Sequence, residues 1–167
     1  MIKLRPAIEI CKRTISASNI TIRGAEIGVL GGGHAVTILA NWPEIYMLHL
    51  VDSYGGIKET DPQFLAFREK FSLYERKMHW HIKTSLAAAP EVPDGSLDFC
   101  YIDANHRYFE VAQDIRAWRP KVRPGGIICG HDYFSHGSVK KAVDDWAAET
   151  NNYIFSTAPD WWCFNDI

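Results

Sequence analysis

Acidic and imidazole side chains stand directly after two short apolar runs of the sequence. Asp103 follows the run at 97–102, and His131 and Asp132 follow the run at 126–129. If both runs are parallel strands, their carboxyl ends meet at one edge of a sheet, where ligands of open α/β sheets collect. Two carboxylates and an imidazole would suit Mg²⁺ or Mn²⁺, although Asp also caps a following segment well. The residues by themselves are thus equally consistent with a divalent-metal site at Asp103, His131 and Asp132 and with aspartates that cap the following segments.

A glycine-rich turn runs from Glu26 to Gly33, and a helical pattern begins immediately after it, near His34. Glycines allow a tight turn and let a ligand approach the backbone N–H groups at a helix N-terminus. The run by itself is equally consistent with a turn that binds nothing.

Asp52 follows the next apolar run, 24 residues beyond Gly28. A carboxylate at this place can accept hydrogen bonds from ribose hydroxyls, or it can cap the following turn. A nicotinamide-dependent oxidoreductase would share this feature, but the G-x-G-x-x-G spacing of such enzymes is absent. The sequence also has no second region to hold a hydride acceptor. We therefore expect a pocket for S-adenosylmethionine, with a non-catalytic module that binds the cofactor or a partner as a further alternative.

The elements that would position these residues alternate between short apolar runs and longer amphipathic ones, which indicates an α/β fold with a parallel sheet. Polar residues alternate with apolar ones in the third run, so that strand is expected near a sheet edge. Two aromatic-rich runs close the chain and predict an antiparallel hairpin. Strands are predicted at 25–30, 45–51, 79–83, 97–102 and 126–129, helices at 6–15, 34–41, 62–76, 108–118 and 138–150, and the hairpin at 153–155 and 161–164.

Length and composition predict one domain over residues 1–167, with an N-terminal helix within residues 1–20 that packs on the sheet. A formal charge of −2 gives no reason to expect nucleic acid or an anionic membrane as a partner, so a small-molecule substrate is expected. The four cysteines form no C-x-x-C pair, and no apolar run approaches a membrane span. We expect a cytoplasmic protein; an oligomer is possible.

The chain resembles a known family over residues 24–167. The resemblance is carried by E-I-G at 26–28, V-D at 51–52, R-P-G-G at 123–126 and, most specifically, by I-D-A-N-H at 102–106 and G-H-D-Y at 130–133. In this order they look like the small class I methyltransferases of the Methyltransf_24 type, which are similar to metal-dependent catechol and sugar O-methyltransferases. The resemblance implies a Rossmann-like, seven-stranded, mostly parallel sheet with helices on both faces and an antiparallel C-terminal hairpin.

The resemblance also implies roles for individual residues. Glu26 would hold the methionine end of S-adenosylmethionine, and Asp52 would hold its ribose. Gly28 and Gly32 keep the register of the family's acidic-x-G-x-G-x-G motif, but Leu30 replaces the middle glycine. Asp103 and Asp132 would be metal ligands. His131 stands where many relatives have an acidic residue.

Several other side chains are expected near the cofactor. Ser85, just past the third strand, is expected near the adenine, and Asp103 should lie beside the cofactor as well as the metal. His34 either touches the cofactor carboxylate or caps its helix. The histidines at 79 and 81 are expected at the surface.

These predictions together describe metal-assisted O-methylation of a small hydroxylated molecule, such as a sugar or a phenol. An alcohol needs help to lose its proton before it attacks the activated methyl group. Only a histidine among the nearby groups titrates near neutral pH, so His106 or His131 is expected to accept that proton.

Overall fold

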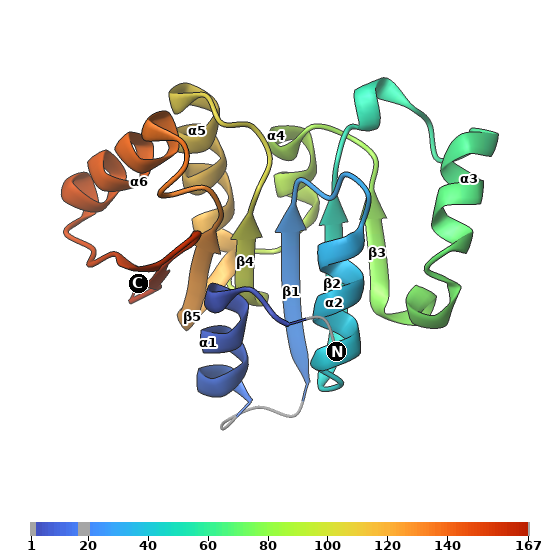
Figure 1. Cartoon of the computed structure of the whole chain (residues 1–167), viewed down its shortest axis with the longest axis horizontal. Coiled ribbons are helices and arrows are strands. Elements are labelled where there is room, and N and C mark those ends of the chain that lie inside the picture. The colour runs from blue at the N-terminus through green and yellow to red at the C-terminus, as the bar shows by residue number, and fades with distance from the viewer. Residues whose placement is uncertain (1–2, 17–20, 167) are drawn as a thin grey trace.

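The computed structural model describes residues 3–16 and 21–166 and has a layered α/β architecture (Figure 1). The described strands form one seven-stranded sheet in the order β3-β2-β1-β4-β5-β7-β6. The first five strands pair in parallel, whereas β7 runs antiparallel to both β5 and β6. This topology confirms the predicted fold class, including the C-terminal hairpin. The strands are β1 (Ile22–Ile27), β2 (Ile45–Val51), β3 (Met78–His81), β4 (Leu97–Ile102), β5 (Val122–Gly130), β6 (Phe155–Thr157) and β7 (Asp160–Phe164).

Helices cover both faces of the sheet, as predicted. The apolar sides of α1 and α2 pack with one face of the sheet, and those of α4, α5 and α6 pack with the other (Figure 1). Strand β4 is buried at every position because it lies in the middle of the sheet between these two layers. The helices are α1 (Pro6–Ile15), α2 (Gly33–Asn41), α3 (Pro62–Glu69), α4 (Ser85–Ala88), α5 (Tyr108–Trp118) and α6 (Gly137–Thr150).

The predicted N-terminal helix forms and packs on the sheet. Proline occupies the first turn of α1, where its missing N–H group costs no hydrogen bond. Ile8 and Cys11 are buried in the same cluster as Phe99 of β4 and Ile127 of β5. Residues 1, 2 and 17–20 of the predicted N-terminal segment lie outside the described residues.

Several predicted boundaries were wrong. Strand β1 begins and ends three residues earlier than the range 25–30, because Gly28 adopts a φ of +90° and turns the chain away from the sheet. The predicted helix at 62–76 stops at Glu69 and is followed by a 3₁₀-helical segment, Ser72–Lys77. Strand β5 starts four residues before 126, and the first hairpin strand starts two residues after 153.

The edge position of β3 is confirmed, but one of its histidines is not at the surface. His79 is exposed, whereas His81 has only 2% of its surface exposed. The reason is its register: His81 pairs with Val51 at the end of β2, where His49 and Glu91 hydrogen-bond to its ring. None of the helices in the described ranges is long and apolar enough to cross a membrane.

Candidate active site

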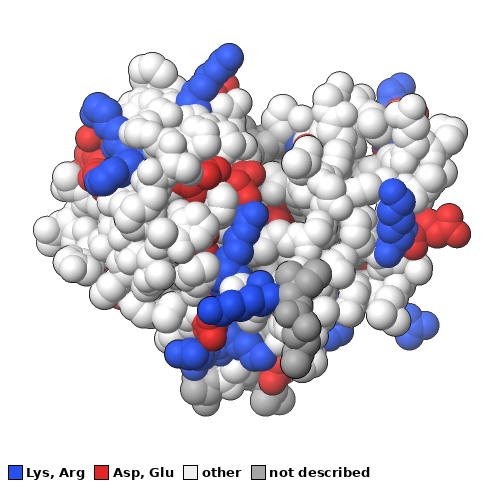
Figure 2. Space-filling model, viewed as in Figure 1, with Lys and Arg blue, Asp and Glu red and all other residues white. Residues whose placement is uncertain are grey.

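A cavity of about 900 Å³ opens at the carboxyl ends of β1, β2 and β4. Figure 2 shows acidic side chains gathered in the hollow above these strand ends, with a basic side chain beside them. The wall combines the glycine-rich turn, the ends of β2 and β4, the start of α4 and one side of α5. Side chains in this wall include Arg5, Glu26, His34, Asp52, Ser85, Asp103, His106 and Asp114.

Glu26 supplies a buried carboxylate to the cavity. Its side chain is 2% exposed, and Oε1 lies 3.0 Å from Nδ1 of His34. Burial raises the pKa of Glu26, while the contact with His34 opposes that rise. Oε2 is buried without a hydrogen-bond partner among the described residues. A buried acceptor of this kind calls for a donor from a ligand, such as an ammonium group.

The glycine-rich turn has the shape that its sequence predicts. A Cβ atom on Gly28 would lie 2.1 Å from the carbonyl oxygen of Asp103, so the turn can approach β4 only without a side chain there. Gly32 has a φ of +69°, and a Cβ atom on it would lie 2.6 Å from the ring of Phe71. Leu30 also adopts a positive φ, of 47°, which explains why a glycine is usual at its place in the motif.

Asp52 holds this turn in place. Its Oδ2 accepts hydrogen bonds from the backbone N–H groups of Val29 and Leu30 at 2.9 and 2.8 Å. Its Oδ1 accepts one from the N–H of Tyr54 at 2.8 Å. The carboxylate therefore does cap the following turn, as one interpretation had it. Because each oxygen accepts two hydrogen bonds, Oδ1 can still accept one from a ribose hydroxyl.

Ser85 lies in the cavity wall, but its hydroxyl is already engaged. Its Oγ accepts a hydrogen bond from Nε1 of Trp118 at 2.8 Å and also bonds with Asp114. Burial raises the pKa of Asp114 to about 6, against the effect of the Ser85 hydrogen bond. Asp114 is thus a second polar group at the predicted adenine end, and the sequence interpretation missed it. The signal was present: Asp114 is a charged residue on the apolar side of α5, between Val111 and Ile115.

Asp103, His131 and Asp132 do come together at the ends of β4 and β5. Nδ1 of His131 lies 3.1 Å from Oδ2 of Asp132 and 3.8 Å from Oδ1 of Asp103. One potential ligand atom from each residue lies within 4.8 Å of the others. The spacing therefore permits the three residues to share an ion.

Arg5 is a further neighbour of this group that the sequence interpretation missed. Its Nη1 donates to Oδ2 of Asp103 at 2.6 Å and to the Tyr101 hydroxyl at 2.9 Å. The contact leaves Oδ1 as the oxygen of Asp103 that faces His131. No local pattern marks Arg5, because it lies 98 residues from Asp103 in the sequence.

Asp132 lies at the centre of several polar contacts. The Ser135 hydroxyl donates to its Oδ1 at 2.5 Å, and Nε2 of His106 lies 2.7 Å from its Oδ2. Partial burial opposes ionisation, but the Ser135 hydrogen bond and the contacts with His131 and His106 together hold the pKa of Asp132 below its usual range. The side chain is therefore a carboxylate throughout the neutral range.

His106 is the predicted proton acceptor that lines the cavity directly. Its contact with Asp132 is an ion-pair contact without hydrogen-bond geometry, and Nε2 has no hydrogen-bond partner among the described residues. His131 is one of the three potential metal ligands, together with Asp103 and Asp132, but it does not line the cavity.

Comparison with known proteins agrees with this geometry. A family model described as a methyltransferase domain (Methyltransf_24) matches residues 25–133, which is more than half of the chain. The uncharacterized protein y4gI of Sinorhizobium fredii (strain NBRC 101917 / NGR234) is 26% identical over 83 residues, which are 48% of this chain and 9% of that protein. The chain thus spans much less than two thirds of this curated relative.

Two solved structures share the fold at low sequence identity. The O-methyltransferase NovP is 17% identical and has a TM-score of 0.74, with 96% of this chain and 78% of that chain covered. A Staphylococcus aureus protein assigned as a caffeoyl-CoA O-methyltransferase is 14% identical and has a TM-score of 0.71, with 98% and 85% covered. With the family match, these findings confirm the resemblance: the chain belongs to the methyltransferase-domain family, and its fold is that of the two O-methyltransferase structures.

Proposed function

We propose that the protein transfers the methyl group of S-adenosylmethionine to a hydroxyl oxygen of a small molecule, with a divalent cation at Asp103, His131 and Asp132. The observation that carries this proposal is the convergence of these three side chains beside the cavity. The O-methyltransferase neighbours, which include NovP, support oxygen as the acceptor atom.

The cavity suits the cofactor in its volume and in its polar groups. The unpartnered Oε2 of Glu26 can accept from the ammonium group of the methionine moiety. At the other end, Asp114 offers an acceptor for the adenine amino group. Asp52 lines the same cavity at the carboxyl end of β2, where a ribose ligand is expected.

The donor set also fits a hard divalent cation. Two carboxylates provide the oxygen ligands that Mg²⁺ and Mn²⁺ prefer, and one imidazole completes the set. When bound, the cation would lower the pKa of the acceptor hydroxyl and polarise its oxygen. Arg5 would keep the Asp103 carboxylate oriented through Oδ2.

We assign proton removal to His106. Its ring lies in the cavity wall, within reach of an acceptor hydroxyl bound there. We prefer His106 to His131 because only His106 is among the residues that line the cavity. Leu30 and Leu86 line the cavity with exposed side chains and provide apolar surface for the acceptor.

The test is methyl transfer from S-adenosylmethionine to a panel of sugars and phenols, with added Mg²⁺ or with chelator. We expect the chelator to reduce turnover by at least about tenfold and added Mg²⁺ or Mn²⁺ to restore it. Unimpaired turnover in chelator would rule out the metal role.

Asp132→Ala separates catalysis from cofactor binding. We expect this variant to lose turnover while calorimetry gives an unchanged affinity for S-adenosylhomocysteine. Asp94→Ala serves as the matched control, since Asp94 is exposed and pairs with Lys121. Binding of NAD instead of S-adenosylhomocysteine would favour the oxidoreductase alternative.

A further inference from the structure

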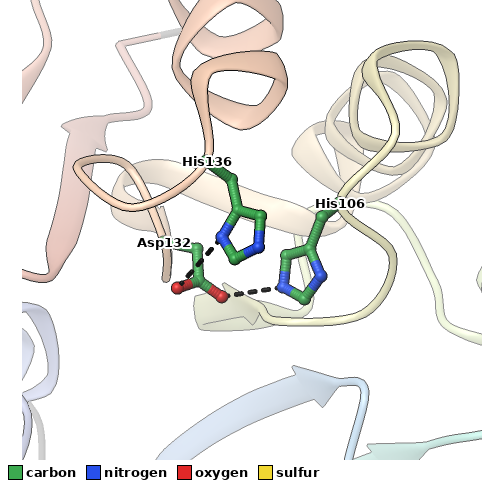
Figure 3. A group of neighbouring side chains, drawn as sticks. All are labelled: His106, Asp132 and His136. Atoms are coloured by element: carbon green, nitrogen blue, oxygen red, sulfur yellow. Dashed lines mark ion pairs between the residues drawn. The ribbon is translucent and has the colours of Figure 1, made fainter.

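A second group of ligand-forming side chains lies beside the proposed metal group and shares Asp132 with it. His106 lies in the loop between β4 and α5, and Asp132 and His136 lie in the loop between β5 and α6, so two loops bring the group together (Figure 3). Nε2 of His106 lies 2.7 Å from Oδ2 of Asp132, and Nδ1 of His136 lies 3.5 Å from Oδ1. The two imidazole rings stack with centroids 4.2 Å apart.

The spacing of this group suits a single ion. One ligand atom from each residue lies within 4.8 Å of the others. Ligands about 2.1 Å from a common ion lie roughly 3–4 Å from each other, so small side-chain rotations would bring all three into contact with it. Nε2 of His106 is buried without a hydrogen-bond partner in the described part of the chain, despite its short distance to Asp132. An ion between the two would satisfy this nitrogen.

Neighbouring serines hold two of the three ligand residues in place. The Ser135 hydroxyl donates to Oδ1 of Asp132, and the Ser138 hydroxyl donates to the backbone carbonyl of His106, each at 2.5 Å. The second bond ties the loop after β4 to the start of α6. Hydrogen bonds of this kind around a metal site orient its ligands.

The chemistry of the group differs from that of its neighbour. Asp103, His131 and Asp132 offer two carboxylates, whereas His106, Asp132 and His136 offer two imidazoles and one carboxylate. Imidazole nitrogen favours Zn²⁺ and similar transition ions over Mg²⁺. The histidine side chains are 42% and 44% exposed, so the group lies at the protein surface.

We propose that His106, Asp132 and His136 form a site for Zn²⁺ or a similar transition ion and that the ion inhibits methyl transfer. Occupancy would engage the ring of His106, the residue assigned to proton removal, and would divide the Asp132 carboxylate between two ions. The inhibition rests on the proposed function; the binding of the ion does not.

The binding test is calorimetric titration of the protein with Zn²⁺ in the absence of cofactor and acceptor. His136→Ser should weaken Zn²⁺ binding by about tenfold or more, because it removes one of three ligands. Serine is a favoured residue before a helix and a poor zinc ligand, so α6 should remain intact. His79→Ser is the matched control: His79 is exposed on β3, outside the group, and its loss should leave the affinity unchanged.

The activity test uses the same two variants with saturating Mg²⁺. Zn²⁺ should inhibit the wild type and His79→Ser alike, while His136→Ser should keep its basal turnover and need about tenfold more Zn²⁺ for the same inhibition. Equal Zn²⁺ affinity in the wild type and His136→Ser would overturn the site. Tight binding without inhibition would overturn the inhibitory role. If no acceptor is ever methylated, the proposed function fails, but the calorimetric result still decides whether the site exists.

Discussion

Glu26 shows what a single buried residue contributes to this site. A carboxylate with 2% of its side chain exposed loses most of its hydration, and only one of its oxygens has a partner in the described chain. Burial of such a group lowers the free energy of unfolding unless a ligand completes its hydrogen bonds. The proposed contact with the methionine end of the cofactor would give the unpartnered oxygen its donor.

Glu26→Gln should lower the affinity for S-adenosylhomocysteine by roughly 10- to 100-fold. The substitution keeps the size of the side chain but removes the negative charge, and a charge-assisted hydrogen bond contributes about 1.5–3 kcal/mol. Calorimetry measures the change directly. Glu149→Gln is the control, because Glu149 is an exposed partner of Arg116. An unchanged affinity would show that Glu26 does not contact the methionine end.

At the scale of elements, the pairing of β2 with β3 brings the rings of His49 and His81 together near the sheet edge. Nδ1 of His49 lies 3.0 Å from Nε2 of His81, whose Nδ1 lies 2.8 Å from Oε2 of Glu91. Burial, with contributions from the nearby charges of His81 and His79, lowers the pKa of His49 to about 4. The side-chain contact between β2 and β3 is therefore made by the imidazole rings of His49 and His81, whose lowered pKa values keep them neutral in the folded protein at neutral pH.

This arrangement predicts that the protein loses stability between neutral and mildly acid pH. The unfolded chain protonates His49 near its ordinary pKa of about 6.5, but the folded chain does not until about pH 4. The unfolded state thus binds more protons in this window, and the free energy of unfolding falls as the pH drops below 6.5. Because the ring is partly exposed, we expect a loss of about 1–2 kcal/mol rather than the full value of the shift.

Urea unfolding at pH 7 and pH 5 checks this prediction. His49→Gln should make the pH dependence shallower, whereas His79→Gln, at an exposed position of β3, should retain most of it. A wild-type free energy of unfolding that stays constant from pH 7 to pH 5 would contradict the expected neutrality of His49.

At the scale of the whole molecule, the cavity exists only when distant segments are assembled. Its wall joins Arg5 before α1, the turn before α2, the ends of β2 and β4, and the side of α5. No one of these segments forms the cavity alone. A ligand that fills it therefore binds the folded chain and not the unfolded one.

S-adenosylhomocysteine should for this reason raise the unfolding temperature. At a ligand concentration 100 times the dissociation constant, the stabilisation is about 2.7 kcal/mol. For a chain of this size that corresponds to a rise of roughly 5–10 °C. Thermal unfolding followed by fluorescence measures it, with NAD at the same concentration as the control. A comparable shift with NAD would contradict the assignment of the cavity to S-adenosylmethionine.

The sequence by itself determined the types and order of the elements and the acidic residues at the strand ends. These features are local: a strand or helix has its own period of apolar residues, and Asp103 and Asp132 follow their strands directly. Placing them at one edge of the sheet required only the parallel topology that the same periodicity indicates. Boundaries set by backbone conformation, such as the end of β1 at Gly28, were less well predicted.

Only the tertiary structure decided which distant side chains meet. It placed Arg5 against Asp103, His136 beside His106 and Asp114 in the cavity wall, and it buried His81 against β2. These contacts depend on the order of strands in the sheet and on the docking of each helix, which no local pattern specifies. For the same reason, the glycine-rich turn was identifiable in the sequence, whereas the role of Asp52 in holding that turn was not.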